Sequence, residues 1–273
     1  VTPGSKKGIN PYLLALLEIF QIDEAYQIGG AQAIAALAYG TNSIKPVNKI
    51  FGPGNAYIAS AKKQVYGKVG IDLIAGPSEI VVVADDSNNP DWVAADMIAQ
   101  AEHDENAQSI LITNSQEFAS KVISKIKYLS IKLPKKNIIE KSLNNFGAVI
   151  ILDDIVKASS IINLIAPEHL HLQSRFSNKI FKNIKNAGCI FLGEYSCEAY
   201  GDYIAGTNHI LPTSGSSKFS SGLGVNDFMK KSSYLKINKK SSYHLEKYVS
   251  QMATIEKLEG HKLSVKVRQK QKK

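Results

Sequence analysis

Hydrophobic positions recur with two different spacings along most of the chain. Short runs of apolar and β-branched residues predict buried strands at Ile71–Ala75, Ile80–Ala84, Ser109–Thr113, Ala148–Leu152 and Cys189–Leu192. Apolar residues three and four positions apart predict helices at Tyr12–Phe20, Ala56–Val65, Gln116–Tyr128, Ile155–Ile165 and Phe176–Ala187, and another that begins at Pro90. This alternation favours a layered α/β fold with parallel strands.

The pattern changes after the last predicted strand. Gly201–His209 is predicted to be a long loop that carries a carboxylate, an amide and an imidazole, and loops of this kind are often functional. Ser214–Gly224 is rich in serine and glycine, as linkers are. Ser242–Glu259 predicts one amphipathic helix that Gly260 ends. Such a helix cannot bury its apolar side alone, so we expect it to dock on its own chain or on a partner.

Composition limits the class of protein. The chain has 273 residues, 44% of them apolar, and no apolar run of membrane-spanning length, which predicts a soluble globular protein without a membrane partner. The net charge of +9 comes from lysines that accompany no nucleic-acid motif, so we expect solvated faces and no nucleic-acid partner. Cys189 and Cys197 are too few for a disulfide framework, and a reducing cytoplasm is their natural setting. Val1 is not an initiator methionine, so we expect a processed chain or a fragment.

The stretch Pro167-Glu168-His169 holds the clearest candidate chemistry. Proline disfavours helical geometry in the residue before it, so the preceding helix should end here and the chain should turn. His169–Leu172 then alternates polar and apolar residues, as a half-buried strand does. One interpretation is an exposed acidic turn before an edge strand. The other is a site of proton transfer, because both side chains exchange protons near neutral pH once their surroundings tune them.

Three other segments could bind a ligand. Gly29-Gly30 opens a helix of small residues, and Gly52-Pro53-Gly54-Asn55 forms a rigid turn whose Asn55 can cap the next helix. Each could admit a cofactor, or could be a tightly packed helix start and a plain turn. Gln100 and His103 are three residues apart on a predicted helix, so they can converge on one ion or lie separately on the surface.

Eight segments in succession resemble the histidinol dehydrogenase family. They are GGAQAIAALAYG, FGPGNAYIASAK, IDLIAGPSE, AQAEHDENAQ, APEHL, FLGEYS, GDYIAGTNHILPT and the His261-Lys262 ending. The resemblance implies NAD-dependent oxidation of L-histidinol to L-histidine through an aldehyde, the last step of histidine biosynthesis. It also implies one zinc ion per subunit, which anchors the substrate.

The resemblance also implies roles for individual residues. Glu168 and His169 match the proton acceptors, with His169 acting on the alcohol and Glu168 on the water that adds to the aldehyde. The matched zinc ligands are Gln100, His103, Asp202 and His261. The matched substrate contacts are Ser78, Gln100, His103, His169, Asp202, Glu256 and His261. Gln32 and Asn55 match NAD contacts, and His209 receives no role.

The family implies three regions and a homodimer. Residues 1–78 would be the second half of a Rossmann-like NAD-binding domain, and residues 79–222 the main α/β domain. Residues 223–273 would form a small C-terminal helical domain that completes the partner subunit's site. The chain begins roughly 150 residues later than the family pattern, a difference the size of one domain. A zinc-dependent hydrolase and a non-catalytic basic binding protein are the alternative functions.

Overall fold

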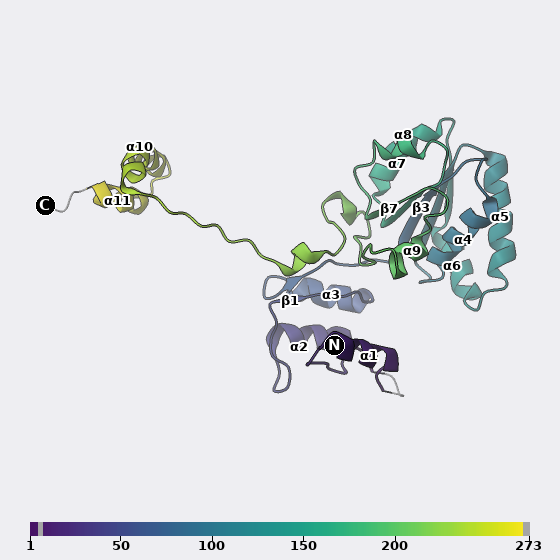
Figure 1. Cartoon of the computed structure of the whole chain (residues 1–273), viewed down its shortest axis with the longest axis horizontal. Coiled ribbons are helices and arrows are strands. Elements are labelled where there is room, and N and C mark those ends of the chain that lie inside the picture. The colour runs from purple at the N-terminus through teal and green to yellow at the C-terminus, as the bar shows by residue number, and fades with distance from the viewer. Residues whose placement is uncertain (5–7, 270–273) are drawn as a thin grey trace. The chain divides into compact units, whose positions relative to one another are not determined.

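The computed structural model describes residues 1–4 and 8–269. They form two compact units, Val1–Asp227 and Phe228–Lys273, which are described separately (Figure 1). The α/β class with parallel sheets is confirmed in the first unit, and the second unit is helical. None of the described helices has the length and apolar character needed to cross a membrane.

A five-stranded parallel sheet with the order β5-β4-β3-β6-β7 organises the first unit. Its strands are β3 (Glu79–Val83), β4 (Gln108–Thr113), β5 (Ala148–Ile151), β6 (His169–Leu172) and β7 (Cys189–Leu192). The central strand β3 pairs Ile80 with Ser109 on one side and with His169 on the other. The beginnings of β3 and β6 therefore lie side by side.

Helices cover both faces of this sheet (Figure 1). Ile80 and Val82 pack with α4 (Pro90–Ala101) and α5 (Gln116–Ser130), which α6 (Lys136–Phe146) extends. Val81 and Val83 pack on the other face with α7 (Ala158–Ile165) and α8 (Ser177–Phe181), and η1 (Ile155–Lys157) precedes α7. Alternate residues of β3 thus feed two separate cores, because successive side chains of a strand point to opposite faces.

A smaller layer precedes the sheet. It contains α1 (Pro11–Ile19), α2 (Gly30–Tyr39), β1 (Lys49–Ile50), α3 (Ala56–Val65) and β2 (Gly70–Ile71). β1 and β2 pair in parallel, and the apolar sides of α2 and α3 pack around Ile50. The predicted strand Ile71–Ala75 is wrong beyond Ile71. Asp72 instead directs its carboxylate to the backbone of Gly52 and to Lys62.

Three segments, one before the last strand of the sheet and two after it, differ from the predicted structure. The predicted loop Gly201–His209 begins inside α9 (Glu198–Tyr203). The predicted helix Phe176–Ala187 is limited to α8, because the Asn163 side chain accepts hydrogen bonds from the backbone of Lys185 and Asn186. The predicted linker contains η2 (Ser216–Lys218) and is fixed to the body, since Ser217 donates to Ala166 O at 2.8 Å. The short η3 (Val225–Phe228) follows it.

The second unit has two main helices where the sequence predicted one. They are α10 (Lys239–Ile255) and α11 (Glu259–Lys266), followed by η4 (Val267–Gln269). Gly260 lies inside α11 and does not end the predicted helix. The break occurs at Lys257, whose φ of 60° is left-handed, and Leu258 N donates back to Ala253 O at 2.7 Å. This is the Schellman arrangement that usually employs glycine.

Candidate active site

Glu168 and His169 lie where β6 begins, between β3 and β7. The predicted helix end is present: Ala166 adopts left-handed geometry with φ 56°, and its N–H donates to Ile162 O at 2.7 Å. The expected half-buried strand is wrong, because all four residues of β6 are buried. β6 lies inside the sheet and is covered on both faces, so its polar side chains need specific partners.

The ring of His169 has one occupied and one free nitrogen. Nδ1 lies 3.0 Å from Glu79 O and donates to it, which places the proton of the neutral ring on Nδ1. Nε2 is buried without a hydrogen-bond partner among the described residues, and it lies 3.8 Å from Asp202 Oδ1. Burial lowers the pKa of His169 below its usual value. The ring is therefore neutral near pH 7, with Nε2 able to accept a proton.

Glu168 has the opposite protonation tendency. Its Oε2 accepts from Glu79 N at 2.9 Å, and its side chain is almost fully buried. Burial raises the pKa of Glu168 to about 8, and the negative charges of Glu79 and Asp202 act in the same direction. A carboxyl group with this pKa can both give and take a proton near neutral pH.

A second buried carboxyl group, that of Glu198, lies close to the ring of His169. With the Gln100 amide oriented to satisfy its neighbours, its Nε2 donates to Glu198 and lies 2.9 Å from both Oε1 and Oε2. Glu198 is 3% exposed, and burial together with Asp202 and Glu168 raises its pKa to about 9. The sequence interpretation missed Glu198. Glu198 lies four residues before Asp202, so a helix over α9 places the two side chains next to each other on the same side. The sequence interpretation did not predict a helix there.

A cavity of about 290 Å³ opens beside these groups. It brings together four of the predicted site residues, Ser78, His103, Glu168 and Asp202. The rest of its lining consists of Pro53, Gly54, Leu73, Ala75, Gly76, His209, Ile210, Leu211 and Thr213. His209, which had no predicted role, is therefore also at the site.

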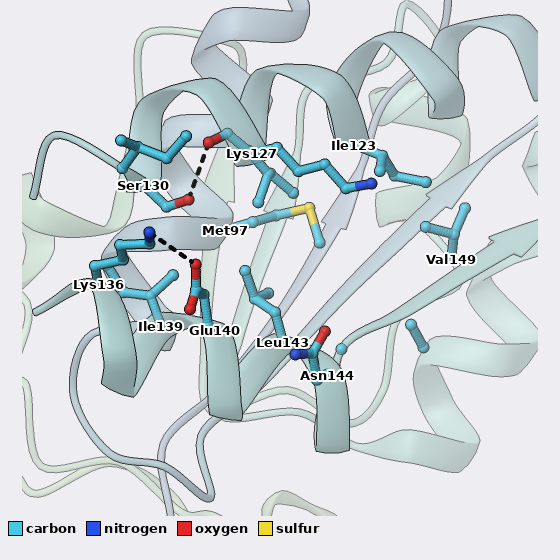
Figure 2. Close-up of a pocket in the computed structure, with 14 residues that line it drawn as sticks. Met97, Ile123, Lys127, Ser130, Lys136, Ile139, Glu140, Leu143, Asn144 and Val149 are labelled. Atoms are coloured by element: carbon cyan, nitrogen blue, oxygen red, sulfur yellow. Dashed lines mark hydrogen bonds and ion pairs between the residues drawn. The ribbon is translucent and has the colours of Figure 1, made fainter.

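A larger cavity, of about 590 Å³, lies among α5, α6 and β5 (Figure 2). Met97, Ile123, Leu143 and Val149 give it an apolar interior. Its carboxylate, Glu140, pairs with Lys136 at 3.5 Å. It offers no imidazole or free acid, so we place the chemistry in the smaller cavity despite the difference in size.

Comparisons with known proteins identify the family to which the chain belongs. The family model described as histidinol dehydrogenase matches residues 1–269. The chain belongs to the histidinol dehydrogenase family. The histidinol dehydrogenase of Clostridium acetobutylicum is 51% identical over 268 residues, which cover 98% of this chain and 62% of that protein. That of Nitrosomonas europaea is 49% identical over the same shares of the two chains.

A solved structure agrees as well. The crystal structure of histidinol dehydrogenase from Elizabethkingia anophelis matches with a TM-score of 0.92 and 40% sequence identity, covering 98% of this chain and 62% of that one. The chain thus spans about three fifths of the length of the histidinol dehydrogenases that it matches. Members of this family are oxidoreductases that act on histidinol.

Of the four residues expected to bind zinc, His103 and Asp202 line the cavity and Gln100 contacts Glu198, and their chemistry is compatible with a metal. Nδ1 of His103 is 2.9 Å from Ala99 O, so the neutral ring keeps Nε2 for a ligand. Asp202 supplies a carboxylate beside it, and Gln100 is fully buried on α4. Among the described residues, the donor atoms of His169, Glu198 and Asp202 lie within 4.8 Å of one another. Asp202 is common to this group and to the predicted ligands.

The two residues matched to NAD contacts lie in the smaller layer. Gln32 is exposed in the first turn of α2, and Asn55 caps α3 by accepting from Ile58 N at 3.2 Å. A buried ion pair fixes the turn before Asn55: Lys62 contacts both Asp72 and Gly52 O, and Asp72 accepts from Gly52 N at 2.7 Å. Gly52 has φ 128°, which a residue with a side chain rarely adopts.

Glu256 and His261 belong to the second unit. Glu256 caps the end of α10, and His261 lies in the first turn of α11. Both side chains are exposed. The break at Lys257 separates the two helices on which they lie.

Proposed function

We propose that the complete protein containing this chain oxidises L-histidinol to L-histidine through the aldehyde, with two NAD⁺ as hydride acceptors. One observation carries the proposal. The buried, neutral imidazole of His169 has an unpartnered Nε2, and the adjacent carboxyl group of Glu168, whose pKa is about 8, lines a cavity with Ser78, His103 and Asp202. Family membership supports the same reaction.

His169 is suited to the first oxidation. As the alcohol loses a hydride from carbon, its hydroxyl proton passes to Nε2 of His169, and the aldehyde remains. The hydrogen bond from Nδ1 to Glu79 O keeps the ring in the required tautomer and stabilises the imidazolium that forms. Because the ring is buried, few water molecules compete for Nε2.

Glu168 is suited to the addition of water between the two oxidations. Its carboxylate takes one proton from water while the water oxygen bonds to the aldehyde carbon, and the imidazolium formed at His169 gives its proton to the aldehyde oxygen, which completes the hydrate. The hydrate then loses a second hydride and a proton to become the acid. With a pKa near 8, Glu168 can both accept and release a proton near neutral pH.

We infer that a zinc ion is held by Gln100, His103 and Asp202 together with His261, and that it anchors the substrate's imidazole and amine when bound. Ser78 and Glu256 would contact substrate, and Gln32 and Asn55 would contact NAD. Both cysteines are free, which agrees with our inference of a cytoplasmic protein.

The proposal is tested on the complete protein by measuring zinc content and NADH formation from L-histidinol. His103→Ala should lose zinc and turnover together, and His244→Ala, on exposed helix α10, should lose neither. A zinc-replete His103→Ala protein with normal turnover would refute the zinc assignment. Substrate cleavage without NADH would favour a hydrolase.

We further propose that residues 1–78, 79–222 and 223–273 act as the three regions defined above, and that the last completes the site of a second subunit. In a symmetric mixed dimer of Asp202→Ala and His261→Ala chains, one site would then receive both lesions and the other would receive none. Each homodimer should be inactive. Mixing should restore roughly a quarter of wild-type activity, because about half of the dimers are mixed and each keeps one intact site.

A matched control uses Asp202→Ala with His103→Ala. Both residues line the same cavity of one chain, so every site keeps one lesion and mixing should restore nothing. Absence of recovery with His261→Ala, when subunit exchange is shown independently, would place His261 in its own chain's site.

A further inference from the structure

Glu198 is a buried acid without a role in the steps above. It begins α9, one helical turn before Asp202, and its side chain is 3% exposed. Burying a carboxyl group is costly unless it makes specific contacts. Its closest polar contact is the Gln100 amide, with both carboxyl oxygens 2.9 Å from Nε2. Its Oε1 also lies 3.9 Å from Nδ1 of His169.

The Gln100 amide has a donor end and an acceptor end, and only the acceptor end can bind a metal. A rotation of 180° about the last side-chain bond exchanges the two ends without changing the shape of the side chain. In the orientation that satisfies its neighbours, the Nε2 end of the amide faces both oxygens of Glu198, which accept from it. This pairing favours the orientation in which Oε1 points to the opposite side.

We propose that Glu198 is a positioning residue for the metal site: by accepting from Nε2 of Gln100, it holds the Gln100 oxygen available to the metal ion. The inference rests on the proposed function only in that a zinc ion occupies the site. Hydrogen-bond partners of metal ligands commonly orient them in this way. The fully buried position of Gln100 on α4 leaves water little access to replace the lost partner.

The alternative role for Glu198 is direct coordination, because its carboxyl group lies within 4.8 Å of donor atoms of His169 and Asp202. The two roles differ in how Glu198 and Gln100 combine. A positioning residue acts through Gln100, so its removal costs little once the Gln100 amide is absent. A ligand binds the metal by itself, so its removal still costs affinity.

The experiment measures the zinc affinity of the complete protein by competition with a chelator, for the wild type and for Glu198→Ala, Gln100→Ala and the double variant. We expect Glu198→Ala to weaken zinc binding by about 10- to 100-fold, the usual effect of removing such a partner. The double variant should bind zinc within about 2-fold of Gln100→Ala. Glu198→Gln keeps an oxygen acceptor of the same length and should recover most of the affinity.

Asp85→Asn is the matched control, because Asp85 is an equally buried carboxylate whose partners are Ser87, Ser174 and Arg175. It should leave zinc affinity unchanged even if it lowers stability. Thermal unfolding of the metal-free proteins, recorded in parallel, shows whether Glu198→Ala folds. Should it fail to fold, Glu198→Leu and Glu198→Gln make the same comparison: loss in the first with recovery in the second supports the inference.

Three outcomes overturn the inference, and each shows whether the proposed function is overturned with it. Wild-type affinity in Glu198→Ala, with zinc lost in His103→Ala, removes the positioning role and leaves the zinc site intact. Full additivity in the double variant makes Glu198 a ligand and likewise spares the proposed function. A wild-type protein that binds no zinc, or a His103→Ala protein that binds it normally, overturns both proposals.

Discussion

Buried carboxyl groups at the two ends of the parallel sheet have pKa values that are shifted in opposite directions. At the end where the strands begin, Glu168 receives one backbone donor from Glu79, and burial raises its pKa to about 8. At the end where they finish, Asp85 follows β3 and accepts from Ser87, Ser174 and the backbone and side chain of Arg175. Burial would raise the pKa of Asp85, but these donors and the charge of Arg175 outweigh it and hold that pKa below its usual value.

The difference separates a structural acid from a reactive one. A buried carboxylate with a full set of donors is fixed in its charged form and links two loops. A buried carboxyl group with few donors keeps a proton that it can exchange. Open α/β sheets usually bind ligands beyond the carboxyl ends of their strands, but here that end is occupied by the Asp85 contacts. The unpartnered Nε2 of His169 and the smaller cavity lie at the other end.

Two histidines of β6 offer the strongest test of this comparison. His169 has a free Nε2, whereas Nε2 of His171 contacts Gly193 O at 2.9 Å and its Nδ1 lies 3.1 Å from Asp96. We expect His169→Ala to lower histidinol turnover by about 10²- to 10⁴-fold, the usual contribution of proton transfer. His171→Ala should instead cost about 1–3 kcal/mol of stability, because Asp96 loses a buried partner, and change turnover of the folded protein only slightly.

NADH formation and urea unfolding of the complete protein measure both quantities for each variant. The comparison fails if His171→Ala lowers turnover as much as His169→Ala does while remaining folded. That result would mean that a histidine contributes to turnover because it is buried in β6, whether or not one of its ring nitrogens is free.

Glu168→Gln sharpens the comparison within the site. The amide keeps an oxygen for Glu79 N but cannot take a proton from water, so oxidation of the aldehyde should fall by about 10²-fold. Oxidation of the alcohol should fall less, because His169 accepts that proton. Single-turnover kinetics with the alcohol and with the aldehyde separate the two, and Glu105→Gln, on the exposed surface, serves as the control. Equal losses in both half-reactions would contradict this division of labour.

The sequence predicts the layers of this fold well because its strands are short apolar runs that alternate with helical spacing. It predicts the turn at Pro167 for a local reason, the effect of proline on its predecessor. Where partners come from distant segments, the local pattern fails. His169-Leu170-His171-Leu172 looks half-buried because its two imidazoles are polar, but Glu79 and Asp96 supply their contacts inside the sheet.

The same limit applies to the remaining errors. Asn163 ends α8 early through contacts with residues more than 20 positions away, and Lys257 ends α10 in a conformation usually left to glycine. The candidate site residues came mainly from family resemblance. Helical spacing pairs Gln100 with His103, but no local pattern shows that Ser78, His103, Glu168 and Asp202 share one cavity. The sequence does not indicate Glu198 as a site residue, because α9 is short and contains Gly201 and is therefore not recognised as a helix.

Asp85→Asn tests the structural end of the sheet. The amide retains one acceptor but turns two N–H groups toward Ser87, Ser174 and Arg175, which are themselves donors. We expect a loss of about 1–3 kcal/mol in the free energy of unfolding near pH 7. Turnover of the folded protein should stay near the wild-type value. A variant of normal stability but low turnover would move chemistry to this end of the sheet.

The pH dependence of that loss gives the smallest and most specific effect. Because the folded-state pKa of Asp85 lies below the ordinary value of 3.8, the unfolded chain takes up the proton first as the pH falls. The stabilisation by Asp85 is therefore complete well above pH 3.8 and is lost as the pH falls through the lower folded-state value. Asn at this position does not titrate, so the gap in unfolding free energy between wild type and Asp85→Asn should narrow in this acid range. Urea unfolding of both proteins from about pH 7 to about pH 3 measures the gap, and other titrating groups cancel in the difference. A gap that stays constant over that range would mean that Asp85 is not held as a charged group, and the contrast with Glu168 would then be one of position alone.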